Sequence, residues 1–169
     1  MNWDKATDIM VYTAIIVAGI LAVLAIYQWI TRKSFAKIDK ALLALIVPAA
    51  LIVITYFLFD HVFIWNTRPD GTGEASFPST HTMITATIFF CTAIILPRYI
   101  KQKYLLVILD LIMLAFVILV PVGRVLANKH WISDCIGALI FSAIFAGIYY
   151  LTVNNLEDSK NHPKLPRRS

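Results

Sequence analysis

Charged residues and cysteines are scarce in this chain. Of its 169 residues, 15% are charged and 59% are hydrophobic, and the mean hydropathy is +0.74. These values exclude an ordinary soluble globular domain. The two cysteines, Cys91 and Cys135, lie in apolar runs at different depths, so we expect buried thiols and no disulfide. Because there is no CxxC pair and no His and Cys cluster, no zinc site is predicted.

Clustered acids, repeats and linkers are also missing. The polar segment 60–81 holds Asp60, Asp70 and Glu74, which are too dispersed in sequence to resemble the carboxylate set that holds magnesium or calcium. We therefore expect chemistry without a metal and without a cofactor. The absence of an internal repeat, a low-complexity block or a linker favours a single domain.

Long apolar runs are what the chain has instead. Four of them are long enough, or nearly so, to cross a hydrocarbon core that needs about 20 apolar residues, at 9–30, 41–59, 104–122 and 132–153. A fifth run, 83–96, becomes adequate when residues 79–82 are added. The sequence thus predicts an all-α, polytopic transmembrane helix bundle with about five spans. Asp4 and Asp8 precede the first run where a signal peptide carries cations, so we expect that run to stay in the mature protein.

The cations indicate how the bundle is oriented. Eleven of the fifteen lie in the first connection, the third connection and the tail: Arg32, Lys33, Lys37, Lys40, Arg98, Lys101, Lys103, Lys160, Lys164, Arg167 and Arg168. The positive-inside rule then places the N-terminus outside and the C-terminus inside. This gives a membrane-embedded domain over 1–153 and a cytoplasmic basic tail over 154–169, which can touch anionic lipid head groups. The same asymmetry explains the net charge of +5, so nucleic-acid binding has no support.

Three polar side chains that could take part in a reaction occur in the segment 123–134, which reads Gly-Arg-Val-Leu-Ala-Asn-Lys-His-Trp-Ile-Ser-Asp. If the next helix has begun by His130, Asp134 shares its face and can accept a proton from the imidazole. The other ring nitrogen would then be a base or a nucleophile. Arg124 would supply a planar cation suited to phosphate oxygens. Solvated surface groups are the alternative, which the position beside a bilayer span disfavours.

The loop 60–81 is predicted to face the same outer side. Arg68 is its cation, and Pro78 and Ser79 are residues that start helices, whose free amides attract anions. His81, in the first turn, could protonate a leaving group; the alternative is a capping Ser79 and an interfacial histidine. Together with the segment 123–134, these groups predict an oxyanion site, most simply for phosphate. His130 would attack phosphorus and His81 would protonate the departing oxygen.

These residues resemble the three signature motifs of the type-2 phosphatidic acid phosphatase family, which is related to the vanadium-dependent haloperoxidases. The matching residues are Arg68-Pro69, Pro78-Ser79-Thr80-His81, and Gly123-Arg124 with His130 and Asp134. The resemblance runs from about residue 41 to 152. It implies that His130 is a nucleophile forming a phosphohistidine, Asp134 its orienting residue and His81 the general acid. It also implies a phosphate-binding set of Arg68, Arg124, Ser79 and Thr80.

Two positions depart from the family pattern. The first motif normally opens with Lys seven residues before the arginine, and here that position is His61, which can contact phosphate when protonated. Asp70 follows the Arg-Pro pair, where an acid would repel phosphate unless it were turned away. Many members also have six spans, and from its five apolar runs we expect this chain to lack the first.

The lead-in 75–79, Ala-Ser-Phe-Pro-Ser, resembles the undecaprenyl-diphosphatase branch. We therefore expect a plasma-membrane lipid phosphatase that acts on undecaprenyl diphosphate at the extracytoplasmic face. The alternatives are a phosphatidic acid or phosphatidylglycerophosphate phosphatase, and a catalytically weak or inactive relative that binds lipid phosphates or serves as an assembly partner, which His61 motivates. A channel or transporter subunit would need ionisable groups in mid-membrane, where Asp110 alone qualifies. The sequence does not indicate an oligomeric state.

Overall fold

The structure is a computed structural model that describes residues 2–161, with side chains as far as residue 156. Helices make up the described chain, apart from loops and one isolated bridge between Thr67 and Ala75. In order they are α1 (Trp3–Arg32), η1 (Phe35–Lys37), α2 (Lys40–Ala44), α3 (Ile46–Phe57), η2 (Leu58–Val62), α4 (Thr80–Ile95), η3 (Leu96–Arg98), α5 (Lys103–Leu126) and α6 (Ile132–Asn161).

Five helical segments are long and apolar enough to cross a membrane: Trp3–Arg32, Lys40–Val62, Thr80–Arg98, Lys103–Leu126 and Ile132–Leu156. The predicted all-α class and the five spans are confirmed. Each segment is longer than the apolar run that predicted it, because polar residues at the ends of a run remain helical. The first helix, for example, begins at Trp3, where the side chain of Asn2 accepts a hydrogen bond from the amide of Lys5.

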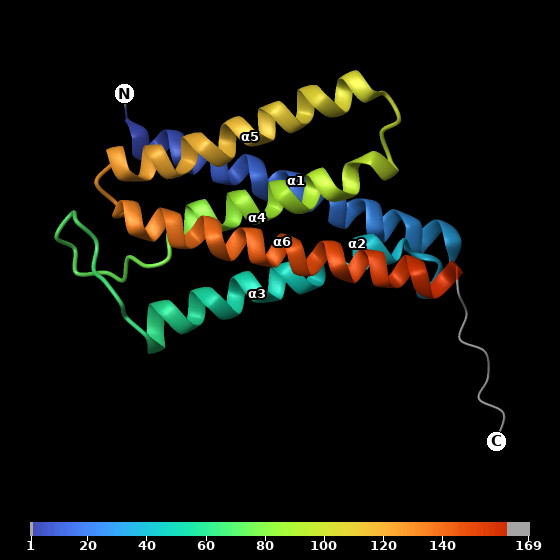
Figure 1. Cartoon of the computed structure of the whole chain (residues 1–169), viewed down its shortest axis with the longest axis horizontal. Coiled ribbons are helices and arrows are strands. Elements are labelled where there is room, and N and C mark those ends of the chain that lie inside the picture. The colour runs from blue at the N-terminus through green and yellow to red at the C-terminus, as the bar shows by residue number, and fades with distance from the viewer. Residues whose placement is uncertain (1, 162–169) are drawn as a thin grey trace.

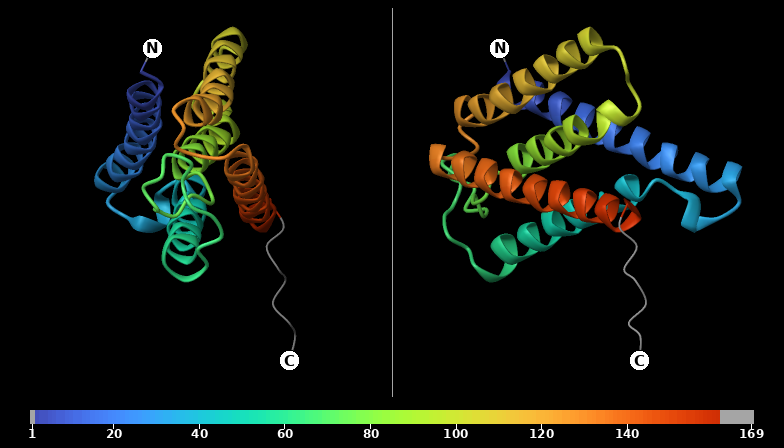
Figure 2. Two further views of the ribbon diagram at one scale, coloured as in Figure 1. Left: turned by 90° about the vertical axis from the view of Figure 1, so that its left-hand side faces the viewer. Right: turned by 45° about the vertical axis from the view of Figure 1, so that its right-hand side comes forward.

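Helix α4 lies at the centre of the bundle and contacts α1, α3, α5 and α6 (Figure 1). The start of α1, the loop 63–79 and the turn 127–131 between α5 and α6 lie at one end of the molecule (Figures 1 and 2). The connections 33–39 and 99–102 lie at the other end. The topology therefore gathers three segments that are distant in sequence at one end, which we call the site end.

Small side chains hold α6 against α4. Ala138, Ser142 and Ala146 recur every four residues on α6 and are all buried, and the Ser142 hydroxyl donates to the carbonyl of Met83 at 3.1 Å. Near the site end, a side chain at Gly137 would collide with the ring of Phe77. The glycine thus lets the loop before α4 seat directly on α6.

Aromatic residues border the site end. Phe63 and Trp65 follow η2 and are exposed, with Trp65 79% accessible, and Trp131 in the α5–α6 turn is 47% accessible. Tryptophan side chains with one apolar and one polar part favour the boundary between lipid and water. The indole of Trp131 also donates to the carbonyl of Thr67 at 2.9 Å and so joins the two loops.

The last helix extends beyond the apolar run 132–153. Helix α6 continues to Asn161, so the first part of the predicted tail, residues 154–161, is helical. Polarity alone does not end a helix, and this stretch holds neither glycine nor proline. The rest of the predicted tail, 162–169, lies outside the described residues. Both cysteines are free and buried, as expected.

Candidate active site

His130 lies in the turn before α6 and is only 4% exposed. Its Nδ1 is 2.9 Å from the carbonyl oxygen of Ser76, which can only accept, so Nδ1 carries the proton. The other nitrogen, Nε2, is then the one with a free lone pair. His130 also lines a pocket at the site end, so that a basic imidazole nitrogen is available to a bound molecule.

Asp134 is fully buried behind this histidine. Its Oδ2 accepts hydrogen bonds from the Ser76 hydroxyl and, at 2.9 Å, from the amide of Trp131. The same oxygen is 3.8 Å from Nδ1 of His130, which is too long for a hydrogen bond. The predicted direct bond is therefore wrong, because α6 begins at Ile132 and His130 is outside the helix. Ser76 lies between the two side chains, since its hydroxyl bonds Asp134 and its carbonyl bonds His130.

Ser76 is the link that sequence reasoning missed. It is 2% exposed, its carbonyl fixes the tautomer of His130, and its hydroxyl is held by Asp134. The residue was noted as part of the lead-in 75–79, but nothing in that pattern pointed to a contact with residues more than fifty positions away.

Burial lowers the pKa of His130 from its ordinary value of 6.5 to about 4. The positive charge of Arg124 acts in the same direction, against the smaller opposing effects of the Ser76 carbonyl and the Asp134 carboxylate. The uncharged ring is therefore favoured, and it persists as the pH falls from 7 towards 4. A neutral imidazole is the form in which histidine is a nucleophile.

We accordingly expect the His130 ring of the substrate-free protein to titrate with a midpoint near pH 4. The measurement is an NMR titration of the imidazole signals in detergent, with the signals of His130 assigned by their loss in His130→Gln. A midpoint at or above 6.5 would contradict the environment described above.

Arg124 is buried at the end of α5, with 4% of its side chain exposed, and its Nη1 donates to Asp4 at 2.7 Å. The start of α1 reaches it because position 123 is glycine: a Cβ there would lie 2.5 Å from Thr7 Cγ2. Nε of Arg124 is buried and has no hydrogen-bond partner. An unpaired buried donor is costly, so this group is suited to an anion that is not yet bound.

Arg68 has the same arrangement on the loop 63–79. Its Nη1 pairs with Glu74 at 2.6 Å, whereas its buried Nε has no partner. The charges of Arg68 and Arg124 both act on His130. Two arginines with unused donors thus lie near one histidine whose neutral form is favoured.

His81 stands in the first turn of α4, as predicted, and its Nε2 is 2.9 Å from Asp8 of α1. Oδ1 of Asp8 is also 4.0 Å from Arg124 Nη1, so His81 and Arg124 lie side by side. No sequence pattern indicated that Asp4 and Asp8 would contact Arg124 and His81. They are separated by more than seventy positions from the residues that they contact.

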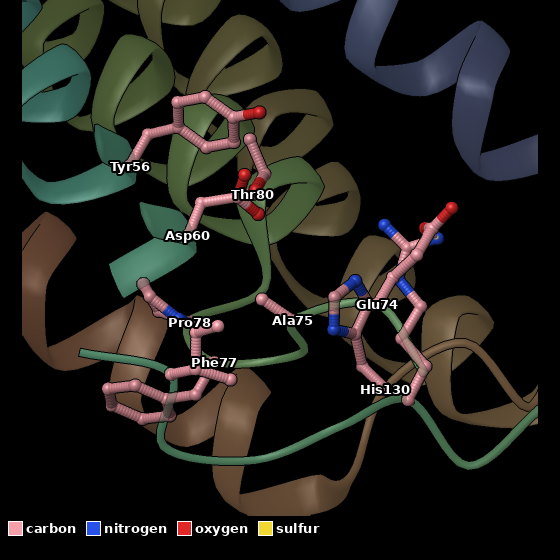
Figure 3. Close-up of a pocket in the computed structure, with 10 residues that line it drawn as sticks. Tyr56, Asp60, Glu74, Ala75, Phe77, Pro78, Thr80 and His130 are labelled. Carbon is pink, nitrogen blue, oxygen red and sulfur yellow. Dashed lines mark ion pairs between the residues drawn. The ribbon is translucent and has the colours of Figure 1, made fainter. Parts of the chain in front are cut away.

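The pocket at the site end has a volume of about 390 Å³ (Figure 3). In Figure 3, Tyr56, Asp60 and Thr80 lie on one side of it, and Glu74 and His130 lie on the other. Its lining is completed by Ile64, Arg68, Ala75, Phe77 and Pro78. Thr80, one of the predicted phosphate contacts, therefore faces the same space as Arg68 and His130.

Ser79 and His61 are placed differently. Ser79 precedes α4 as expected, but it is fully buried and its hydroxyl pairs with that of Thr82 at 3.0 Å. His61 lies on η2 with 52% of its side chain exposed, 3.3 Å from Asp60 and stacked on Phe57. Neither residue lines the pocket. The η2 turn places the His61 ring on Phe57 of α3. His81 and Arg124 are likewise not among the residues that line the pocket.

The carboxylate of Asp70, the residue after the Arg-Pro pair, is turned away from the arginines, as phosphate binding there requires. It accepts hydrogen bonds from Thr72 and pairs with Lys129 at 3.1 Å. These contacts, those of Thr72 first, hold the pKa of Asp70 below its ordinary value. The carboxylate stays ionised and neutralises a lysine of the neighbouring turn.

No group of three or more His, Cys, Asp or Glu side chains that could hold a metal ion occurs among the residues that the structure describes. Three of the carboxylates at the site end each pair with a basic side chain: Asp4 with Arg124, Asp8 with His81 and Glu74 with Arg68.

The sequence model of the PAP2 superfamily matches residues 62–158, more than half of the chain. The chain belongs to the PAP2 superfamily. The three predicted motifs lie inside the matched range, whereas Asp4 and Asp8 precede it. No curated protein sequence gave a significant match.

The fold of this PAP2 protein is similar to a solved structure described as the first transmembrane PAP2-type phosphatidylglycerolphosphate phosphatase from Bacillus subtilis. The TM-score is 0.62 at 17% identity, over 97% of this chain and 79% of that one. At this identity the likeness shows the fold. Membership of the superfamily and the transmembrane fold together indicate a membrane phosphatase, consistent with lipid phosphate hydrolysis.

Proposed function

We propose that this protein is an integral membrane phosphatase that hydrolyses a lipid phosphate or diphosphate without a metal ion, through a phosphohistidine at His130. The observation that carries the proposal is the pair of arginines, each with a buried and unpaired Nε, beside a histidine whose Nδ1 is tied and whose Nε2 is free. Such a group of donors suits the equatorial oxygens of a phosphoryl group.

The reaction has two steps. In the first, Nε2 of His130 attacks the terminal phosphorus and the bond from it to the leaving oxygen breaks. That oxygen belongs to the lipid alcohol in a monophosphate substrate and to the lipid monophosphate in a diphosphate, and His81 gives it a proton. In the second, water attacks the phosphohistidine, His81 takes the proton of the water, and phosphate leaves with His130 restored. Arg68 and Arg124 hold the phosphoryl oxygens throughout, with Thr80 and the first amides of α4 beside them.

The head group would bind in the pocket while the lipid tail stays in the bilayer. The exposed tryptophans at the site end support this, because tryptophan side chains favour the boundary between lipid and water. Lys and Arg are concentrated in the connections at the opposite end, which supports a site on the extracytoplasmic side of the plasma membrane.

Undecaprenyl diphosphate remains our first candidate substrate, on the resemblance of the lead-in 75–79. In the structure two residues of that lead-in contact the protein itself: Ser76 holds His130, and Phe77 packs against Gly137. The residue types at these two positions therefore help to hold the nucleophile in place, whether or not they also select the substrate. Phosphatidylglycerophosphate is the second candidate, which the solved structure with a similar fold favours.

The test measures phosphate release by the purified protein from undecaprenyl diphosphate, phosphatidylglycerophosphate and phosphatidic acid, each with and without EDTA. We expect release that EDTA does not reduce, fastest from undecaprenyl diphosphate. Activity that EDTA abolishes and Mg²⁺ restores would contradict the metal-free chemistry. Faster release from phosphatidylglycerophosphate would reassign the substrate.

A further inference from the structure

Helix α1 contributes two carboxylates to the site, and both come from outside the part of the chain that the family model matches. Asp4 binds Arg124 at 2.7 Å, and Asp8 binds Nε2 of His81 at 2.9 Å. These contacts are built into the fold. Thr7, between them on the helix, is fully buried, and its Cγ2 approaches the position that a side chain at Gly123 would fill.

We propose that Asp8 is a positioning residue for His81: it fixes the ring and stabilises its protonated form, so that His81 can protonate the leaving oxygen of the lipid. The inference rests on the proposed function. It gives each histidine of the site a carboxylate, Asp134 acting on His130 through Ser76 and Asp8 acting on His81 directly. With Nε2 of His81 held by Asp8, Nδ1 is the atom that would donate to the leaving oxygen.

Charged groups from two helices face His81. Asp8 and Asp4 face it from α1, and Arg124 faces it from α5. The remaining titratable groups near the start of α4 are engaged elsewhere or belong to the pocket: His130 and Asp134 contact Ser76, and Asp60 pairs with His61. Without Asp8, the charge of Arg124 would be opposed by Asp4 alone, which already binds Arg124.

If Asp8 instead competes with substrate phosphate for its binding position, the opposite result is expected. Its Oδ1 is near both His81 and Arg124, so it could occupy a position that substrate phosphate must take. Removing a competitor of this kind would lower KM and raise activity. Removing a positioning residue would instead lower kcat, and most strongly where the leaving oxygen needs a proton.

The experiment compares Asp8→Asn with the wild-type protein on two substrates, a lipid phosphate with an alkyl leaving group and p-nitrophenyl phosphate, whose phenolate leaves without protonation. General acid catalysis contributes roughly 10²- to 10⁴-fold. Because Asp8→Asn retains the imidazole of His81 but removes the charge that holds it, we expect kcat for the lipid phosphate to fall by about 10- to 100-fold and kcat for p-nitrophenyl phosphate by less than about threefold. The alkaline limb of kcat/KM should move to lower pH.

Controls separate this effect from damage to the fold. Asp110→Asn makes the same change on the exposed face of α5, about 21 Å along the helix from Arg124, and should leave both activities unchanged. Asp8→Glu keeps a carboxylate and should restore most of the lipid phosphatase activity, which also gives an answer if Asp8→Asn does not fold. In a His81→Ala background, Asp8→Asn should have no further effect.

Equal losses on the two substrates, or a pH profile that does not move, would overturn the inference while leaving the phosphatase itself intact. A lower KM with higher activity would assign Asp8 as a competitor of phosphate. If the wild-type protein released no phosphate from any substrate, the proposed function would fail, and the inference with it.

Discussion

Replacement of His130 by alanine is expected to abolish phosphate release, with a loss on the order of 10⁴-fold or more in kcat, as for other catalysts that lose a nucleophile. The side chain is buried, lines the pocket, and has one nitrogen fixed by Ser76 and the other free. No other imidazole among the described residues has this arrangement. Alanine leaves the arginines in place, so the variant should still bind substrate.

A covalent intermediate makes this test specific. Brief reaction of the wild-type protein with substrate labelled in the phosphoryl group, followed by denaturation at alkaline pH, should leave label on the protein that acid removes, as expected for a phosphoramidate. His130→Ala should retain no label. Labelling of the variant equal to the wild type, or equal turnover, would refute the assignment of His130 as the nucleophile.

Asp134→Asn is expected to lower kcat by roughly 10³-fold. This is somewhat less than the loss in a triad whose carboxylate bonds the histidine directly, where the same replacement leaves the wrong tautomer. The carboxylate accepts hydrogen bonds from Ser76 and Trp131 and is fully buried. An asparagine can present its amide nitrogen to one of these donors, which would displace Ser76 and with it the carbonyl that holds His130. The protein should remain folded, because the side chain keeps its shape.

A double-mutant cycle tests whether Asp134 acts through Ser76. Ser76→Ala removes the hydroxyl but keeps the backbone carbonyl, so we expect a smaller loss, about 10-fold, that adds nothing to Asp134→Asn. Ser133→Ala is the matched control, because its hydroxyl makes only a long contact of 3.5 Å with Asp134. Fully additive effects of Ser76→Ala and Asp134→Asn would show that the carboxylate reaches His130 by another route.

Much of the architecture followed from local patterns. Runs of about twenty apolar residues predicted five spans, since a lipid core imposes its thickness on any helix that crosses it. The order of the connections then placed the loop with Arg68 and the turn with His130 at the same end, where the structure also has them (Figure 1). Helix ends were less well predicted, because polar residues continue a helix into the interface, as at residues 154–161.

The individual contacts of the site could not be predicted in this way. The spacing of His130 and Asp134 favoured a direct hydrogen bond. However, α6 begins after His130, and Ser76 lies between the two side chains. His61 occupies the position of a family lysine, yet the turn at η2 directs it to Phe57.

The sequence by itself determined the class of protein, the five spans and the set of arginines and histidines from which a phosphate site could be made. Tertiary structure alone decided which partners these groups have. Asp4 and Arg124 are 120 positions apart, and Asp8 and His81 are 73 apart. Hydropathy and helical periodicity act over a few turns of one chain segment, whereas such pairs depend on how closely whole helices pack, here on the absence of a side chain at Gly123.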